Sequence, residues 1–299
     1  AENAVPLPKD AFPGKTVIVI GEDHSDGQLV VYVSNTVGDL ANGKLYVLKR
    51  TDNNTVETDI VKGQVYDVEL VELDNVKTSK GSELSQQTVD KKAIQFARVE
   101  DVDYRKGGGA NGREVYFTAT GVSPDLVNPV AGKNMWGRVY RMIFDATNPL
   151  QGKLELVAEG DTEAGTGIIN PDNLCVTQNY VYIQEDGDSF YTNAKHDSRV
   201  WQYSIANKAL KPMLEANHKR TDAEFNAKYN TVNVNKLGSW EFGAMYDISD
   251  LTGIPDTFIL NIHPHTWQED KFKNADGSVV RERDNKEGGQ TIILSGIAR

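Results

Sequence analysis

Residues 168–188 read IINPDNLCVTQNYVYIQEDGD, and this stretch gives the clearest indication of the fold class. Two short apolar segments, 174–177 and 180–184, meet at Gln178–Asn179, which predicts an antiparallel hairpin. Polar residues border both segments: Asp172 and Asn173 before the first, and Glu185, Asp186 and Asp188 after the second. In a hairpin, the start of one strand and the end of the next lie at the same edge. Both polar groups are therefore expected at one rim, where a hard cation or charged substrate would offset carboxylate repulsion.

The rest of the chain repeats this pattern of short strands separated by Gly, Asn and Asp. Further strands are expected at 16–20, 28–34, 44–49, 65–72, 114–119, 136–144, 153–158, 199–204, 257–262 and 290–295. One helix is expected at 221–230, with Thr221 as its cap and Glu224 in the capping-box position. The polar stretches 78–92 and 103–113 are expected to be loops. The prediction is an all-β fold with long loop insertions.

Some of these strands resemble one another. The segments 43–48, 137–142 and 198–203 each start with a small residue and a base, followed by an aliphatic and an aromatic residue. The segments 114–118 and 180–184 form a second similar pair. Such repeats are typical of successive propeller blades, although any β protein with outward aromatic residues can show them. We predict a β-propeller, or its carboxy-terminal blades, as one domain over 1–299 that is incomplete at its amino-terminal side.

The bulk composition limits the possible partners. The 43 acidic residues outnumber the 32 Lys and Arg residues among 299, so the net charge is −11. This argues against nucleic acid or an anionic membrane as a partner, because either needs a basic surface. No run of about 18 apolar residues is present, so no membrane span is predicted. The first residues, AENAVP, lack the features of a signal peptide. The single cysteine, Cys175, is expected to be a buried apolar residue rather than a reactive thiol.

Acidic and amide residues gather at the ends of the predicted strands. They lie at 21–26, 98–101, 172–173 and 185–188, and at 240–241 together with 263–266. In a propeller, corresponding strand ends surround one channel, so residues distant in sequence can meet. Calcium takes about 6–8 oxygen ligands, which carboxylates, amides and carbonyls supply. For each group alone the alternative is an ordinary turn, because Asp and Asn commonly form turns.

The histidines and a search for common catalytic motifs give little further evidence about function. His263 and His265 are expected to face opposite sides of their segment and not to form a two-histidine metal clamp. His265 alone is a candidate site residue, with a structural role as the alternative. His24 is expected to be an exposed turn residue. The Gly-x-Ser-x-Gly and His-Glu-x-x-His motifs are missing, so a serine hydrolase or zinc protease has no support.

Several motifs follow one another in an order that is known from one family. GEDH at 21–24, LVVYVS at 29–34 and GKLYV at 43–47 are similar to Gly-Asp-Asp, Tyr-x-Phe-Val-Ser and Gly-x-Leu-Tyr-Val. ARVED at 97–101 is similar to a motif that contains Arg-Pro-Glu-Asp. The order continues with VYFT at 115–118, PDNL at 171–174, WE at 240–241, DISD at 247–250 and LNIHPHT at 260–266. Over most of its length the chain resembles the PhoX-type alkaline phosphatases and their phytase-like relatives.

The resemblance implies a β-propeller whose central site holds calcium together with iron and hydrolyses phosphate monoesters. Carried over by motif, Asp172, Asn173 and Glu241 fall on expected metal-ligand positions. Glu100 is a further candidate ligand, and Arg98 is a candidate for contact with the phosphate. The implied mechanism is metal-assisted attack on phosphorus in a small phosphoester. The implied location is secreted or periplasmic.

Two departures from the family pattern favour an alternative, non-catalytic function. Ser25 and Gly27 occupy positions where the family is expected to carry an arginine and a glutamate. The amino-terminal half of the family, with its Cys and Glu ligands, has no counterpart here. Iron is therefore expected only if a missing amino-terminal segment or another protein chain supplies that half. The alternative function is a non-catalytic, calcium-stabilised propeller that binds proteins or glycans or has a structural role at a surface.

Overall fold

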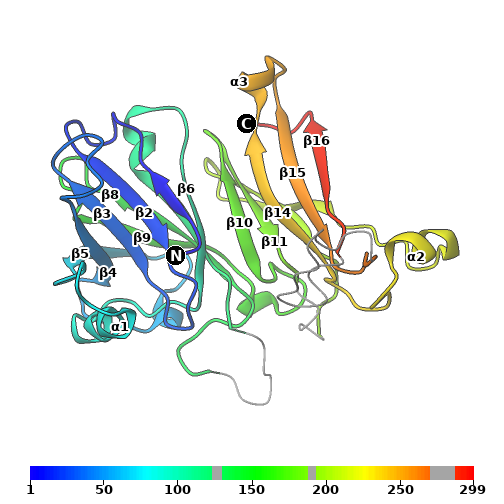
Figure 1. Cartoon of the computed structure of the whole chain (residues 1–299), viewed down its shortest axis with the longest axis horizontal. Helices are drawn as coiled ribbons and strands as arrows, with labels where there is room; N and C mark the ends of the chain where they lie inside the picture. Colours follow the sequence, from blue (N-terminus) through cyan, green and yellow to red (C-terminus); the bar gives the residue numbers. More distant parts are fainter. Residues whose placement is uncertain (123–129, 188–192, 270–286) are drawn as a thin grey trace.

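The computed structural model describes residues 1–122, 130–187, 193–269 and 287–299. In these residues sixteen strands form three antiparallel sheets. Figure 1 shows how the strands are arranged. Short helices lie between them: α1 (Gly81–Asp90), α2 (Ala223–Tyr229), α3 (Ser249–Thr252) and the 3₁₀ turns η1 (Glu57–Asp59), η2 (Gly109–Arg113) and η3 (Asp161–Glu163). No helix in the described part of the chain is long and apolar enough to cross a membrane. The prediction of an all-β fold is confirmed.

The largest sheet has nine strands in the order β1-β2-β3-β4-β5-β9-β8-β7-β6. The bounds are β1 (Ala4–Pro6), β2 (Thr16–Gly21), β3 (Leu29–Ser34), β4 (Lys44–Arg50), β5 (Val65–Glu72), β6 (Val99–Tyr104), β7 (Glu114–Ala119), β8 (Arg138–Phe144) and β9 (Gln151–Glu159). The sheet curls until β6 contacts β1 and β2, so that it is nearly closed. Side chains alternate between the two faces of the curled sheet: in β2, Val17 and Val19 face the enclosed core and are buried. Phe96, Phe117 and Tyr140 fill the centre of this core.

Two smaller sheets carry the remaining strands. One consists of β10 (Pro171–Val176), β11 (Tyr180–Glu185), β12 (Arg199–Ser204) and β13 (Leu210–Glu215), in that order. The other consists of β14 (Trp240–Asp247), β15 (Thr257–Pro264) and β16 (Gln290–Ser295). The hairpin predicted from residues 168–188 is present as β10 and β11, with Pro171 opposite Glu185. The buried rings of Tyr182 and Phe258 pack between the two sheets, with centroids 5.3 Å apart.

Strands β6 and β10 lie side by side although they belong to different sheets (Figure 1). Side chains take the place of backbone pairing between them. The Asp101 carboxylate accepts a hydrogen bond from the Leu174 amide at 2.6 Å, and the Asp103 carboxylate accepts one from the Val176 amide at 2.8 Å. Both contacts advance by two residues along both strands, so β6 and β10 run in the same direction. Inner strands that run in parallel around a common centre are the propeller-like feature of the fold.

The predicted strands are present, but four further strands were not predicted. These are β1, β6, β13 and β14. β6 reads VEDVDY, and β14 reads WEFGAMYD with an irregular register between Phe242 and Met245. β13 contains Pro212, which suits an edge strand. Acidic residues, glycine and proline interrupt the apolar pattern of these strands, which is why the sequence did not predict them.

Two predictions about helices and loops were wrong in detail. The stretch 78–92, predicted as a loop, contains α1, whose first turn is closed by Glu83 accepting from the Lys80 amide at 2.7 Å. The helix predicted at 221–230 is α2, but its cap is Asp222 rather than Thr221. The Asp222 side chain accepts from the Phe225 amide at 3.0 Å.

The repeats agree in part with the strand order. The 137–142 and 198–203 segments are in β8 and β12, each the third strand of its group, and the 114–118 and 180–184 segments are in β7 and β11, each the second. The 43–48 segment is in β4, which is the fourth strand of the first group when β1 is counted. It is therefore not equivalent to the other two. The extent of the domain over 1–299 stays a prediction.

Candidate active site

Charged residues gather at one edge of the inner strands, here called the central rim. Its members are Glu2, Asp23, Arg98, Glu100, Asp172, Asp186, Glu241 and His265. Glu2 precedes β1, Arg98 precedes β6, Asp172 lies in β10, and Glu241 lies in β14. Asp186 follows β11 and His265 follows β15, which return to the same edge because each is antiparallel to its neighbour. In each hairpin, the inner strand begins at this edge and the next strand, which is antiparallel to it, ends there.

The tightest group on the central rim is formed by Asp186, Glu241 and His265. One ligand atom from each lies within 4.8 Å of the other two, and all three residues are partly buried. His265 Nε2 is 3.3 Å from a Glu241 oxygen, and its Nδ1 is 2.7 Å from a Glu287 oxygen. Burial alone lowers the pKa of His265, but the hydrogen bonds with Glu241 and Glu287 outweigh burial and raise it to about 9. A protonated His265 therefore offsets part of the negative charge of this group.

Asp172 shows that the carboxylates of the central rim repel one another. Burial raises the pKa of Asp172 to about 7, and the negative charge of Glu241 acts in the same direction. The Arg98 guanidinium opposes both effects. The negative charges of Glu2 and Asp23 also raise the pKa of Asp172. A bound cation would reverse this shift, because a positive charge favours the ionised carboxylate.

Arg98 supplies the positive charge of the rim. Its Nε donates to Asp23 Oδ1 at 2.8 Å, and its Nη2 pairs with Glu100. Its backbone lies in the left-handed region, with φ of 65°. Non-glycine residues seldom adopt this conformation, and those that do cluster at functional sites. Glu100 itself is only 4% exposed, so its carboxylate is held in place by Arg98 rather than by water.

The structure places the residues predicted from sequence as follows. Glu100, Asp172 and Glu241 lie on the central rim rather than on separate outer surfaces. Asn173 lies beside them, and its side-chain amide donates to the Asp172 carboxylate at 2.7 Å. Their roles as ligands, and the role of Arg98 with phosphate, stay predictions. Asp188, part of the predicted acidic group, lies outside the described residues.

Two parts of the sequence prediction need correction. Glu185 does not face the rim: it is buried and accepts hydrogen bonds from the Ile169 and Arg199 amides and from Trp201 Nε1, each at 2.7 Å. His263 and His265 do not face opposite sides, since their rings stack with centroids 6.5 Å apart. Residues two apart in an extended segment share a face, which is the reason that the prediction was wrong.

Sequence reasoning missed Glu287 and gave Asp186 only as one of three acids that follow the hairpin. Glu287 lies in the highly charged segment 268–289, and no local pattern links it to His265. The isolated bridge between Gln268 and Glu287 brings it to the rim. Only the pairing of distant segments could have revealed this contact.

The family departures at Ser25 and Gly27 have a structural explanation. Gly27 bridges to Phe96, and a Cβ added to Gly27 would lie 2.3 Å from the Glu22 carbonyl oxygen. No larger residue fits there without a backbone shift. Arg98 and Glu100 belong to the separate motif ARVED, so they are no replacement for the arginine and glutamate expected at 25 and 27.

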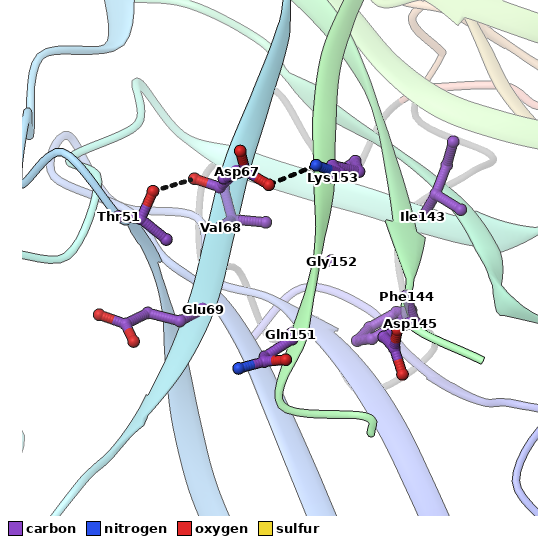
Figure 2. A pocket seen from close by; sticks show the side chains of 10 residues that line it. All are labelled: Thr51, Asp67, Val68, Glu69, Ile143, Phe144, Asp145, Gln151, Gly152 and Lys153. Carbon is purple, nitrogen blue, oxygen red and sulfur yellow. Dashed lines mark hydrogen bonds and ion pairs between the residues drawn. The ribbon is translucent and has the colours of Figure 1, made fainter. Parts of the chain in front are cut away.

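A second acidic region lies away from the rim, between β5 and the ends of β8 and β9. This outer pocket of about 470 Å³ is lined by Thr51, Asp67, Glu69, Asp145, Gln151 and Lys153, among others (Figure 2). Its charges are paired or exposed: Asp67 pairs with Lys153, and Glu69 pairs with Lys49 at 2.9 Å. The hydrogen bond from the Thr147 amide heads the contacts that lower the pKa of Asp145. The outer pocket thus lacks the repulsion that marks the rim.

Comparisons with known proteins agree with the fold. The structure is similar to that of Pseudomonas fluorescens PhoX in complex with vanadate, a transition state analogue, with a TM-score of 0.57 and 17% identity. The likeness covers 87% of this chain but 48% of that one, so the chain spans about half its length. No curated protein sequence matches. The family described as Alkaline phosphatase PhoX matches residues 3–234. The chain therefore belongs to the PhoX alkaline phosphatase family.

Proposed function

We propose that the central rim is a cation-dependent site for the hydrolysis of small phosphoesters, with calcium as the cation. One observation carries this proposal: Asp172, Asp186 and Glu241 converge beside Arg98 although they come from separate parts of the chain. Converging carboxylates are costly unless a cation or substrate neutralises them. The raised pKa of Asp172 is a sign of that cost in the protein alone.

The donor set fits a hard cation. Carboxylate oxygens of Asp172, Asp186, Glu241 and Glu100, with the Asn173 carbonyl oxygen, are the ligand type that calcium takes. His265 adds an imidazole, which suits iron better than calcium. Iron at this place would need further ligands from an amino-terminal segment or another chain. When bound, a cation would neutralise the charge that develops on the phosphoryl oxygens.

The residues of this chain have separate roles in the proposed reaction. Arg98 supplies a guanidinium cation, which is the kind of group that binds phosphoryl oxygens. Glu100 pairs with its Nη2. Asp172 and Glu241 exclude anions from the site until a cation is present. The secreted or periplasmic location that the family resemblance implies is part of the proposal.

Turnover of p-nitrophenyl phosphate tests this function. Activity is expected to require calcium, to be lost with a chelator, and to fall about 10²-fold or more in Asp172→Ala, since preorganised charge stabilisation is then removed. Glu69→Ala in the outer pocket is the matched control and should leave turnover unchanged. Turnover that is indifferent to both the chelator and Asp172→Ala would reject the site.

A non-catalytic, cation-stabilised propeller is the second candidate. The close packing at Gly27, which leaves no room for the glutamate expected in the family, favours it. On this alternative, calcium raises the melting temperature and no phosphoester is hydrolysed. A melting temperature that responds to neither calcium nor chelator would exclude both candidates.

A further inference from the structure

We propose that Asp23 is a positioning residue that fixes the orientation of the Arg98 guanidinium for a phosphoryl group. The proposal deepens the proposed function and depends on it, because it assigns to Arg98 a contact with phosphate. It is carried by the contacts of the loop 21–27, which lies against the start of β6. Neither Asp23 nor this loop is needed to fill the apolar core.

The first step is the geometry of the ion pair. Arg98 Nε lies 2.8 Å from Asp23 Oδ1, and Arg98 Nη2 lies 3.5 Å from Asp23 Oδ2. Two nitrogens on one side of the guanidinium thus face two oxygens of one carboxylate. Such a paired contact fixes the plane of the guanidinium as well as its position, which a single contact would not do.

The second step is the backbone that carries Arg98. The left-handed conformation of Arg98 is held from both sides: its amide donates to the His24 carbonyl at 3.0 Å, and its carbonyl accepts from the Thr120 amide at 2.9 Å. His24 is the residue after Asp23. The same loop therefore holds both the backbone and the side chain of Arg98.

The third step is how closely the loop approaches β6. A Cβ added to Gly21 would lie 2.2 Å from the Glu100 carbonyl oxygen, and Gly27 exchanges two backbone hydrogen bonds with Phe96 at 2.9 and 3.1 Å. Glycines at both ends of the loop permit this approach. The loop is thus anchored at both ends, and Asp23 lies between the anchors.

The fourth step separates positioning from stability. The side chains of Arg98 and Asp23 are 38% and 33% exposed. Ion pairs that are exposed to this degree contribute little to folding stability, because solvent screens them. Misplacement of a group that binds a reacting phosphoryl oxygen, in contrast, can cost up to about 10²-fold. Loss of Asp23 should therefore affect anion binding far more than the melting temperature.

The test is a double-mutant cycle with inorganic phosphate as the probe, titrated by calorimetry into the calcium-loaded chain. Asp23→Asn is expected to weaken phosphate binding about tenfold and to leave the melting temperature within a few degrees. Arg98→Lys keeps the charge but lacks the fork and should weaken binding to a similar extent. The double variant should bind no more weakly than Arg98→Lys alone, because both changes remove one interaction.

Asp26→Asn is the matched control. Asp26 lies in the same loop and pairs with Lys133 at 2.8 Å rather than with Arg98, so its loss should leave phosphate binding unchanged. Additive effects in the cycle, or wild-type binding by Asp23→Asn while Arg98→Lys is impaired, would overturn the positioning role alone. Wild-type binding by Arg98→Lys, or no phosphate binding by the wild type, would overturn this inference together with the proposed function.

Discussion

The central rim and the outer pocket contain similar residues in different surroundings. The rim holds Asp172 and Glu241 partly buried and close enough to repel each other, and the pKa of Asp172 is raised to about 7. The outer pocket in Figure 2 holds Asp67 and Asp145, which are exposed and are paired with a lysine or with backbone amides. There the contacts of Asp145 lower its pKa.

The difference shows that the number of acidic residues says little about function. Both regions are hollowed or open, and both contain several carboxylates. Of the two regions, only the rim combines partial burial, a carboxylate pKa raised by burial and by a neighbouring carboxylate, and an arginine in a left-handed backbone conformation. These features cost folding free energy, and such cost is characteristic of sites that bind a charged partner. Variants in the two regions can test this contrast directly.

The largest expected effect in this comparison is on the pH dependence of stability without cation. The folded-state pKa of Asp172 is raised above its unfolded value, so the native protein holds a proton that the unfolded chain releases. In chelator, the free energy of unfolding should therefore fall as pH rises from about 4 to 7, by on the order of 2 kcal/mol. Urea unfolding at several pH values measures this.

Asp172→Asn should reduce that pH slope without abolishing it, because burial also raises the pKa of Asp101, to about 6. Asp145→Asn should leave the slope unchanged between these pH values. A slope as steep in Asp172→Asn as in the wild type would show that the rim does not carry the repulsion assigned to it.

A smaller effect is expected on the affinity for calcium. Glu241→Gln removes one anionic ligand while keeping the shape of the side chain, and it should weaken calcium binding about tenfold or more. Glu69→Gln in the outer pocket should have no effect. Calorimetric titration with calcium measures the affinity of each variant. Equal affinities would contradict the claim that the rim binds calcium and the outer pocket does not.

The smallest effect is expected in the outer pocket itself. Asp67→Ala breaks the pair with Lys153, in which both side chains are more than half exposed. The free energy of unfolding should change by less than about 1 kcal/mol, because solvent screens such pairs. A larger loss in chemical denaturation would mean that the outer pocket has a structural role that its exposure does not suggest.

How much the sequence could predict depends on the position of a strand in the fold. Outer and middle strands such as β3 and β12 show apolar alternation and were predicted near their true bounds. The inner strands β6 and β14 carry the residues of the rim, and their acidic residues disrupt the alternation. Two strands that carry residues of the rim were therefore missed, whereas β10, which carries Asp172, was predicted as part of the hairpin.

The site was predictable to the extent that it follows from one hairpin. The rule that a hairpin returns to its starting edge brought together Asp172 and Asp186, and the family motifs added Arg98, Glu100 and Glu241. Glu287 and the contact of Asp23 with Arg98 depend on how distant segments pack. No local pattern records the 75 residues that separate Asp23 from Arg98.

The link between β6 and β10 has a consequence for how this family can vary. Asp101 and Asp103 align one sheet with the next through carboxylates rather than through a continuous backbone ladder. The spacing between two blades is then encoded in two side chains, and a single codon change can alter it. A substitution at Asp101 or Asp103 should therefore change the spacing between β6, which follows Arg98, and β10, which carries Asp172.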